Sequence, residues 1–309
     1  MRNKTSIWFL IVILSLLLNR SSFPGEEENF KPKFSIRLMG GWDYMGVGDI
    51  NTHLESYDAH LSEMTNYEGG RTKKLNNYGS DLEVELRLDI SPKFAVSVGI
   101  EYMSEKTKSY FEYTGPFPFQ ALFEAKQNYF IKPKVKTIPL KLGIYYTLPL
   151  SSRINLILNS GLGYYFSKAS LYKCHWSSNY GGYMIIYTKE ENYDVSSKGL
   201  GFHGGIGFEY NIANNLALVL EVQGRYARIK NLKGNRFYNL TFGVNPGVEE
   251  EGILYIGERD LTVEGYGENC PDLIISQSKP SGDEFRGVRE AVLDFSGFSL
   301  RAGIRIKLF

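Results

Sequence analysis

The sequence has few of the residues and patterns that mark enzymes, metal sites or nucleic-acid-binding domains. It holds 2 Cys and 4 His among 309 residues, and it contains no Cys-x-x-Cys pair, phosphate-binding loop, dinucleotide fingerprint or zinc pattern. The formal net charge of +1 does not fit the strongly basic surface of a nucleic-acid-binding protein. We therefore expect no cofactor, no metal and no nucleic-acid partner.

Long apolar runs are also scarce. The longest, "IWFLIVILSLLL", follows the basic start "MRNK" and has the length of a signal-peptide core. We expect a signal peptide at 1–22 and a periplasmic N-terminal segment at 23–33; the alternative is an uncleaved anchor. No later segment has 18 consecutive apolar residues. If the mature chain crosses a membrane, it must therefore cross as a closed β-barrel.

Aromatic residues and glycine are abundant, and the aromatics make up 14% of the chain. This composition favours strands joined by turns. In "DLEVELRLDI" (81–90), aliphatic and charged residues alternate without exception, which predicts a strand with one apolar and one charged face. Similar alternation recurs in seven other stretches, so that eight strands are expected in all: 34–44, 81–90, 94–102, 138–148, 156–166, 200–212, 216–226 and 298–308. Each is roughly 10–13 residues long, close to what a tilted strand needs to cross a bilayer.

The links between these strands alternate between short and long. Short links carry "SPK", "PLSSR" and "ANN", and the long ones run over about 47–78, 104–135, 168–198 and 229–292. In an up-and-down arrangement, this places both termini and all the tight turns at one end. We therefore predict an all-β fold, an eight-stranded antiparallel up-and-down transmembrane β-barrel over 34–309, with short periplasmic turns and long extracellular loops.

The face opposite the apolar stripe carries acids and bases in nearly equal number. In a small barrel this face fills the interior, where an unpaired charge is costly, so we expect a network of paired charges. Its expected members are Arg37, Asp43, Asp81, Glu83, Glu85, Arg87, Asp89, Glu101, Lys141, Glu209, Glu221, Arg225, Arg301, Arg305 and Lys307. For the acids of 81–90, the candidate partners are Arg37, Arg225, Arg301 and Arg305, with Arg37 nearest by topology.

The signal, the eight amphipathic strands, the unequal links and the last strand "GFSLRAGIRIKLF" together resemble the small outer membrane β-barrels of the OmpA/OmpX/OmpW-like type. The C-terminal Phe309 is similar to that family's assembly signal, although it lies one step out of phase with the apolar stripe. The resemblance implies insertion from the periplasm by the barrel insertion machinery, contact with outer membrane lipid, and no single biochemical activity.

The remaining candidates for chemistry have plainer structural interpretations. Cys174 and Cys270 fall in two of the long links and could form a disulfide or stay free. His203 lies on the interior face, where a hydrogen-bonded role is favoured over catalysis. The stretch "DINTHLESYDAHLSEM" predicts a helix capped by Asp49, with His53 and His60 two turns apart, too far to share a metal ion.

Aromatic residues near the strand ends are expected at the two membrane interfaces: Phe34 and Phe94 at the periplasmic one, and Trp42, Tyr44, Tyr102 and Tyr164 at the outer one. A further pair, 253–256 with 261–263, is expected as a hairpin above the membrane; the alternative places it in the wall as strands nine and ten.

The function that fits best is a non-enzymatic outer membrane protein whose loops meet an unknown extracellular ligand. The alternatives are a narrow pore for small solutes, a lipid-modifying enzyme and, last, a secreted soluble β protein.

Overall fold

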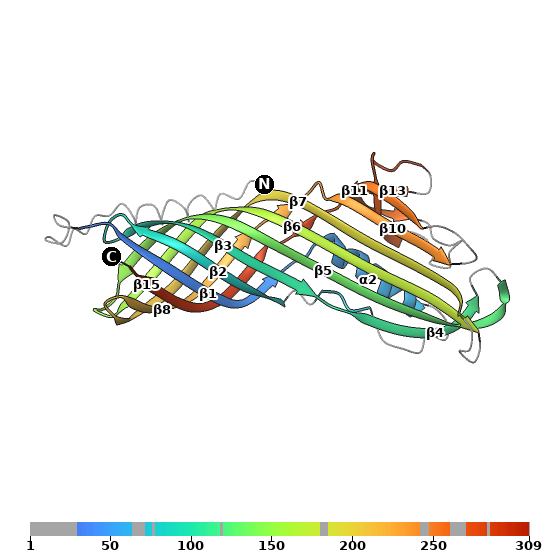
Figure 1. Ribbon diagram of the computed structural model, residues 1–309, viewed down its shortest axis with the longest axis horizontal. Coiled ribbons are helices and arrows are strands. Elements are labelled where there is room, and N and C mark those ends of the chain that lie inside the picture. Colours follow the sequence, from blue (N-terminus) through green and yellow to red (C-terminus); the bar gives the residue numbers. More distant parts are fainter. Residues whose placement is uncertain are drawn as a thin grey trace, which may run out of the picture.

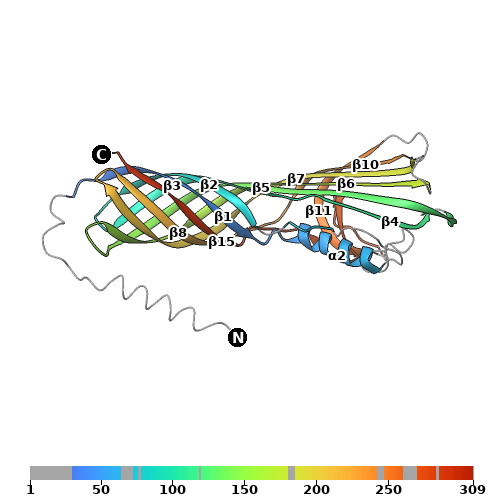
Figure 2. The same cartoon turned by 90° about the horizontal axis from the view of Figure 1, so that it is seen from below.

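The structure is a computed structural model that describes residues 30–63, 72–75, 78–117, 120–179, 185–241, 247–259, 270–282 and 285–308 (Figure 1). The expected signal peptide and Phe309 lie outside these residues. The body is elongated, with a ring of strands at one end and a sheet that continues from it at the other (Figures 1 and 2).

The ring is built from eight antiparallel strands, each paired with two neighbours. Around it the order is β1, β2, β3, β5, β6, β7, β8 and β15, and β15 pairs with β1 again. All eight predicted strands lie in it. Their bounds are β1 Lys33–Met45, β2 Tyr78–Asp89, β3 Phe94–Lys106, β5 Gln120–Pro149, β6 Ile154–Asn179, β7 Ile185–Ala213, β8 Leu216–Tyr226 and β15 Gly297–Lys307.

The alternation of the sequence decides which side chains enter the ring. In β2, the charged Glu83 and Glu85 are buried, whereas Leu82, Val84 and Leu86 are exposed on the outside. The other ring strands follow the same rule, because successive side chains of a strand point to opposite faces. The ring is therefore apolar outside and polar inside, the reverse of a water-soluble fold.

The tight turns lie together at one end of the ring, where the described chain also starts and ends, because Ser35 pairs with Lys307. Two of these turns use the same device. The hydroxyl of Ser91 accepts a hydrogen bond from the backbone N–H of Phe94 at 3.0 Å, and Ser151 does so from Ile154 at 3.1 Å. Serine fits such turns because its side chain can bond to nearby backbone groups.

Three ring strands continue far beyond the others at the opposite end. β5, β6 and β7 have 30, 26 and 29 residues and run the whole length of the molecule (Figure 1). The predicted long loops over 104–135 and 168–198 were therefore largely wrong. Alternation persists there, but the outward positions become polar, so these segments lack the apolar stripe by which the ring strands were recognised. Pro133 and Pro139 both lie within β5.

Other strands widen this continuation into what we call the extension: residues 120–134, 169–179 and 185–197 of β5–β7 with the elements that pack on them. β4 (Ser109–Phe117) pairs with β5, and β10 (Lys233–Thr241) pairs with β7. β11 (Val248–Arg259) joins β10 to β12 (Cys270–Ser276) and β13 (Phe285–Glu290). Residues 253–256 thus lie in β11, outside the ring; 261–263 lie outside the described residues.

The extension has an apolar core of its own. The helix α2 (Asp49–Glu63) covers it on one side (Figure 2), and Leu54 of α2 packs among buried residues such as Leu171, Val195 and Leu273. A short pair, β9 (Arg228–Ile229) with β14 (Leu293–Asp294), closes it toward the ring. No helix among the described residues is long and apolar enough to span a membrane.

Asp49, predicted as the cap of α2, is the first residue of the helix, and its carboxylate binds another segment of the chain. The Asp49 carboxylate accepts hydrogen bonds from the backbone N–H of Val292 at 2.7 Å and from the Arg289 guanidinium at 2.7 Å. It therefore fastens the helix to the segment before β14. The preceding Gly48 has a φ of +73°, and a Cβ there would lie 2.3 Å from the Val292 carbonyl oxygen, so this close approach requires glycine.

Candidate functional site

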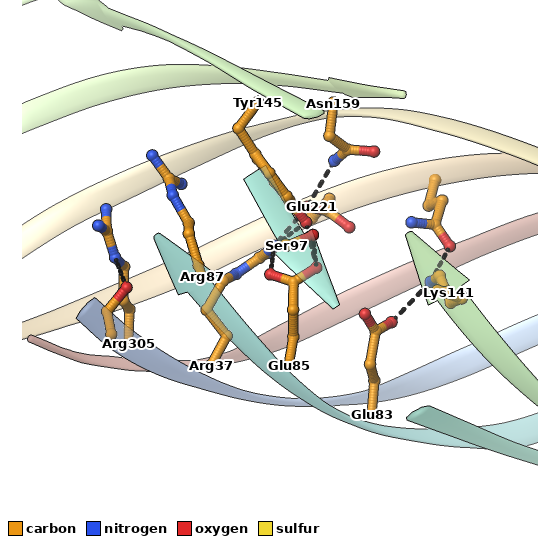
Figure 3. Close-up of polar contacts among 12 residues, drawn as sticks. Arg37, Glu83, Glu85, Arg87, Ser97, Lys141, Tyr145, Asn159, Glu221 and Arg305 are labelled. Carbon is orange, nitrogen blue, oxygen red and sulfur yellow. Dashed lines mark hydrogen bonds and ion pairs between the residues drawn. The ribbon is translucent and has the colours of Figure 1, made fainter. Parts of the chain in front are cut away.

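The interior of the ring is the densest gathering of charged groups in the described chain. Arg37 of β1 and Arg301 of β15 are each about 1% exposed, although they are among its largest side chains. Both meet acidic residues contributed by other strands, as shown in Figure 3 for Arg37. Buried charges require such partners, since isolated ones cost several kcal/mol.

Arg37 connects both sides of the ring. Its guanidinium donates to Glu85 of β2 at 3.0 Å and to Glu221 of β8 at 2.9 Å. It also contacts the Tyr145 hydroxyl, which itself donates to Glu85 at 2.7 Å. The Tyr145 ring lies between two cations, with Arg37 at 5.0 Å and Arg87 at 4.7 Å from its centre. These contacts join β1 to β2, β5 and β8 through the interior of the ring at this level.

A second group lies one layer nearer the extension. Arg301 pairs with Glu83 and Glu101 and donates to Glu221 at 2.7 Å. The Lys141 ammonium lies 2.8 Å from Glu83 and 3.2 Å from Glu101. Glu221 thus bridges the Arg37 and Arg301 groups, and the network is continuous across β1, β2, β3, β5, β8 and β15.

The ends of the interior have smaller groups. Near the tight turns, Arg305 pairs with Glu209 at 3.0 Å and with Asp89, which Arg87 also contacts at 2.9 Å. Near the extension, Arg225 pairs with Asp43 and donates to the Phe295 carbonyl at 2.6 Å.

The structure thus places the predicted interior charges inside the ring and brings most of them into contact. For the acids of β2, Arg37 meets Glu85, Arg301 meets Glu83 and Arg305 meets Asp89. Arg225 was a wrong choice of partner, since it pairs with Asp43. Asp81 is the weakest member, with Arg301 Nε 4.0 Å away, and Lys307 lies 3.8 Å from Glu209.

The histidines gather no catalytic or metal-binding partners among the described residues, where no cluster of three potential metal ligands occurs. The His203 ring packs inside the ring over Gly161. No described serine or carboxylate hydrogen-bonds to its nitrogens. His53 of α2 meets the Pro271 carbonyl at 3.1 Å and Asp272 at 3.8 Å. Burial, with a smaller effect of Lys173, lowers the pKa of His53 to about 4. The side chain of His60 lies outside the described part.

Of the two alternatives for Cys174 and Cys270, the disulfide is not formed, since Cys174 is a free thiol. Its side chain is half-buried and lies close to Tyr172 and Glu190, and burial raises the pKa of the thiol. Within the sheet, β7, β10 and β11 separate β6 from β12, whereas a disulfide needs neighbouring backbones. The side chain of Cys270 lies outside the described part.

The predicted interface aromatics lie near the two ends of the ring. Phe34 and Phe94 are exposed at the tight-turn end, and Trp42, Tyr102 and Tyr164 are exposed toward the extension. Tyr44 also lies at that end, stacked on Phe298 at 5.4 Å.

Sequence reasoning missed a charged cluster in the extension. Glu191 is 5% exposed, and it meets Lys173 at 2.7 Å, Arg236 at 3.0 Å and Lys189 at 3.4 Å. Burial alone would raise the pKa of Glu191, but these three cations outweigh it and hold that pKa well below its usual range. The signal was present as alternation in "YKCHWSS" and "TKEENYDV", which had been assigned to a loop.

The chain is similar to known outer membrane proteins. Its sequence matches the family model of the outer membrane protein beta-barrel domain over residues 40–245, a range that begins in β1 and includes all of β2, β3 and β5–β8. Among solved structures, the crystal structure of a major outer membrane protein from Thermus thermophilus is similar, with 15% identity, a TM-score of 0.38 and coverage of 90% of this chain and 100% of that one. No curated protein matches. The family match covers more than half of the sequence, and the chain therefore belongs to the outer membrane protein β-barrel domain family and has its place in the outer membrane.

Proposed function

We propose that the ring is an eight-stranded barrel that spans the outer membrane, is closed to solutes, has no enzymatic activity, and holds the extension outside the cell as an interaction surface. Its tight turns would face the periplasm, in keeping with the short periplasmic turns of such barrels. The proposed partners are outer membrane lipid, the insertion machinery during assembly and an extracellular ligand.

The membrane placement is supported by an inversion of polarity along β5, β6 and β7. On β5 the outward residue changes from Ile138 to Lys136, while the inward residue changes from Thr137 to Val135. On β6 the outward change is from Phe166 to Lys168. Cross-strand register puts Lys136 opposite Lys168, and Ile138 opposite Phe166. A bilayer boundary explains why the inversion falls in the same rows.

β7 follows the same pattern. Its outward residue changes from Leu200 to Lys198, and inward Val195 and Tyr193 belong to the apolar core of the extension. Lipid therefore meets the apolar outside of the ring, and water meets the polar outside of the extension.

The burial of Arg37 and Arg301 is the main observation in support of a barrel that is closed to solutes. A water-filled path along the axis would expose these side chains, yet each is about 1% exposed. Paired charges that shield one another from water replace the solvent of a pore.

Planar-bilayer conductance tests the closed barrel. We expect little or no single-channel conductance from the wild type. The double variant Arg37→Ala/Glu85→Ala removes both partners of a central pair and should open a detectable path, showing that inserted barrels are being measured. Steady channels from the wild-type protein would instead establish the narrow pore.

Cys174 offers a test of orientation, because it lies on the outer face of β6 beyond the polarity inversion. In intact cells that carry the Cys270→Ser variant, a membrane-impermeant maleimide should label Cys174. The control is Cys174→Ser/Cys270→Ser, which should stay unlabelled. Labelling that requires broken cells would place the extension on the periplasmic side and overturn the proposed orientation.

A further inference from the structure

A group of lysines encircles part of the molecule where the ring gives way to the extension. This basic belt consists of Lys106 of β3, Lys132, Lys134 and Lys136 of β5, Lys168 of β6 and Lys198 of β7. All six occupy outward positions, and Lys136 and Lys168 are half-buried while the other four are exposed. The belt begins directly beyond the outward aromatic residues Tyr102, Tyr164 and Phe166.

The belt brings like charges together. Cross-strand register places Lys106 opposite Lys134, and Lys136 opposite Lys168. Like charges directly opposite each other on one face of a sheet destabilise it. Two such pairs in adjacent rows therefore carry a free-energy cost that the fold alone does not explain.

Few carboxylates offset this charge. Lys168 pairs with Asp194 at 2.7 Å, and Lys198 lies over the Phe166 ring at 5.4 Å from its centre. Among the described residues, the other four lysines of the belt have no ion-pair partner. The surface is thus a cationic band at the level where a bilayer would present its head groups.

We infer that the basic belt binds the phosphate groups of phosphorylated glycolipids in the outer leaflet of the outer membrane, with lipid A as the chemical type. The inference rests on the proposed membrane placement of the ring. Acyl chains would lie along outward residues such as Ile138 and Leu140, and the phosphates would lie among the lysines and relieve their repulsion. A lysine near an anionic lipid surface contributes about 1 kcal/mol to binding.

Lipid retention tests this inference. The probes are diphosphoryl lipid A, monophosphoryl lipid A and zwitterionic phosphatidylcholine, each titrated into the protein in neutral detergent and measured by native mass spectrometry. The wild type should bind the diphosphoryl form most tightly and phosphatidylcholine least. Equal binding of all three would overturn the inference.

The belt variant is Lys134→Gln/Lys136→Gln/Lys198→Gln, which leaves the Lys168–Asp194 pair in place. Its affinity for diphosphoryl lipid A should fall about 10- to 100-fold. The matched control is Lys33→Gln/Lys93→Gln/Arg153→Gln, which removes two exposed cations and the half-buried Lys93 from separate places at the opposite end of the ring and should change affinity less than about twofold. Equal losses in both variants would reduce the effect to net charge and overturn the inference.

Stability and competition give independent readouts. Diphosphoryl lipid A should raise the melting temperature of the wild type but not that of the belt variant, whose lipid-free melting temperature should be equal or higher because repulsion is removed. Inorganic phosphate that displaces lipid A at equal concentration would show a site for free phosphate and overturn the lipid assignment. Should the belt variant fail to fold, the salt dependence of the wild type tests the inference instead. An electrostatic site should lose lipid A when NaCl is raised from about 50 to about 500 mM, and retention of lipid A in high salt would overturn the inference.

Heat-modifiable mobility and dependence on detergent test the barrel itself. A folded, detergent-dependent barrel that does not prefer diphosphoryl lipid A would overturn the belt inference alone. A protein that is soluble without detergent would overturn the membrane placement as well.

Discussion

The ring and the extension share three strands, but the interior of the ring is charged and that of the extension is apolar. Inside the ring, Arg37, Glu85 and Glu221 fill the space as hydrogen-bonded ions. Inside the extension, Leu171, Val195 and Leu273 form an ordinary apolar core. The same backbone ladder supports both, so the strand pairing does not determine which kind of core forms. In the membrane placement proposed above, the difference follows from the medium outside: lipid favours apolar outward residues, which leaves the polar ones to fill the interior.

The largest expected effect concerns the interior of the ring. Arg301→Met should destabilise it by about 3–5 kcal/mol, because Glu83, Glu101 and Glu221 lose a shared cation while they remain buried. The measurement is the temperature at which heat-modifiable mobility is lost. A drop no larger than that of Lys126→Met, which breaks the exposed pair with Glu112 (3.0 Å), would show that the ring does not depend on its ion pairs.

The corresponding change in the extension is Leu54→Ala. It removes a fully buried side chain of α2 and should cost about 3 kcal/mol through lost burial and a residual cavity. Limited proteolysis should then cut the extension faster, while the heat-modifiable mobility of the ring stays close to that of the wild type. An equal loss in both readouts would mean that the two interiors form one cooperative unit.

A smaller effect should appear as a pH dependence of the extension alone. The pKa of His53 is lowered to about 4 by burial, so between pH 6.5 and about 4 the unfolded state binds more protons than the folded state. Stability should therefore fall as the pH decreases through this window. The measurement is the hydrogen-exchange protection factor of the α2 amides, each rate taken relative to the unfolded chain at the same pH, at pH 7 and pH 5. His53→Gln should reduce the difference between the two protection factors.

His175 is a second buried histidine of the extension, and its variant separates its own contribution from that of His53. It stacks on Tyr129 at 4.0 Å, and burial, with a smaller effect of Lys189, lowers its pKa to about 3. Because its pKa is also lowered, His175 adds a pH dependence of the same sign, so His175→Gln should remove that part and leave the part due to His53 at α2 in place. Equal protection factors of the wild-type α2 amides at both pH values would contradict the assignment.

The smallest effect is expected at the surface of the extension. Lys74 pairs with Glu55 of α2 at 2.7 Å, but both side chains are about half exposed. Such pairs contribute about 0–1 kcal/mol, so Lys74→Ala should leave α2 proteolysis nearly unchanged. A loss as large as that of Leu54→Ala would mean that ion pairs, not apolar packing, hold the helix in place.

The ring was largely predictable from the sequence, because a strict alternation such as that of 81–90 fixes both the strand and its two faces. The apolar outside and polar inside of the ring make this pattern unusually clear. The extension was not predictable from the sequence, because the outward positions of β5–β7 turn polar and the core positions lie among charged residues such as Glu191. Local patterns could not separate these strands from loops.

Individual partners needed the fold. Arg225 and Arg301 lie on adjacent strands and occupy the same face, but their levels along the axis differ, so one meets Asp43 and the other meets Glu83. Register and depth are long-range properties that the sequence of one strand does not contain. The same holds for Cys174, whose distance from β12 depends on the strands inserted between them.

The unbroken pairing of β6 with β7 has a mechanical meaning. The ladder runs without a register shift from Ile154 to Ser177, so the pairing continues unbroken from the ring into the extension. From Lys168 outward, the strand rises roughly 30–40 Å. In the proposed orientation, the extension would act as a stiff spacer that holds its ligand at a set height above the bilayer and passes any pull on its tip directly into the wall of the ring.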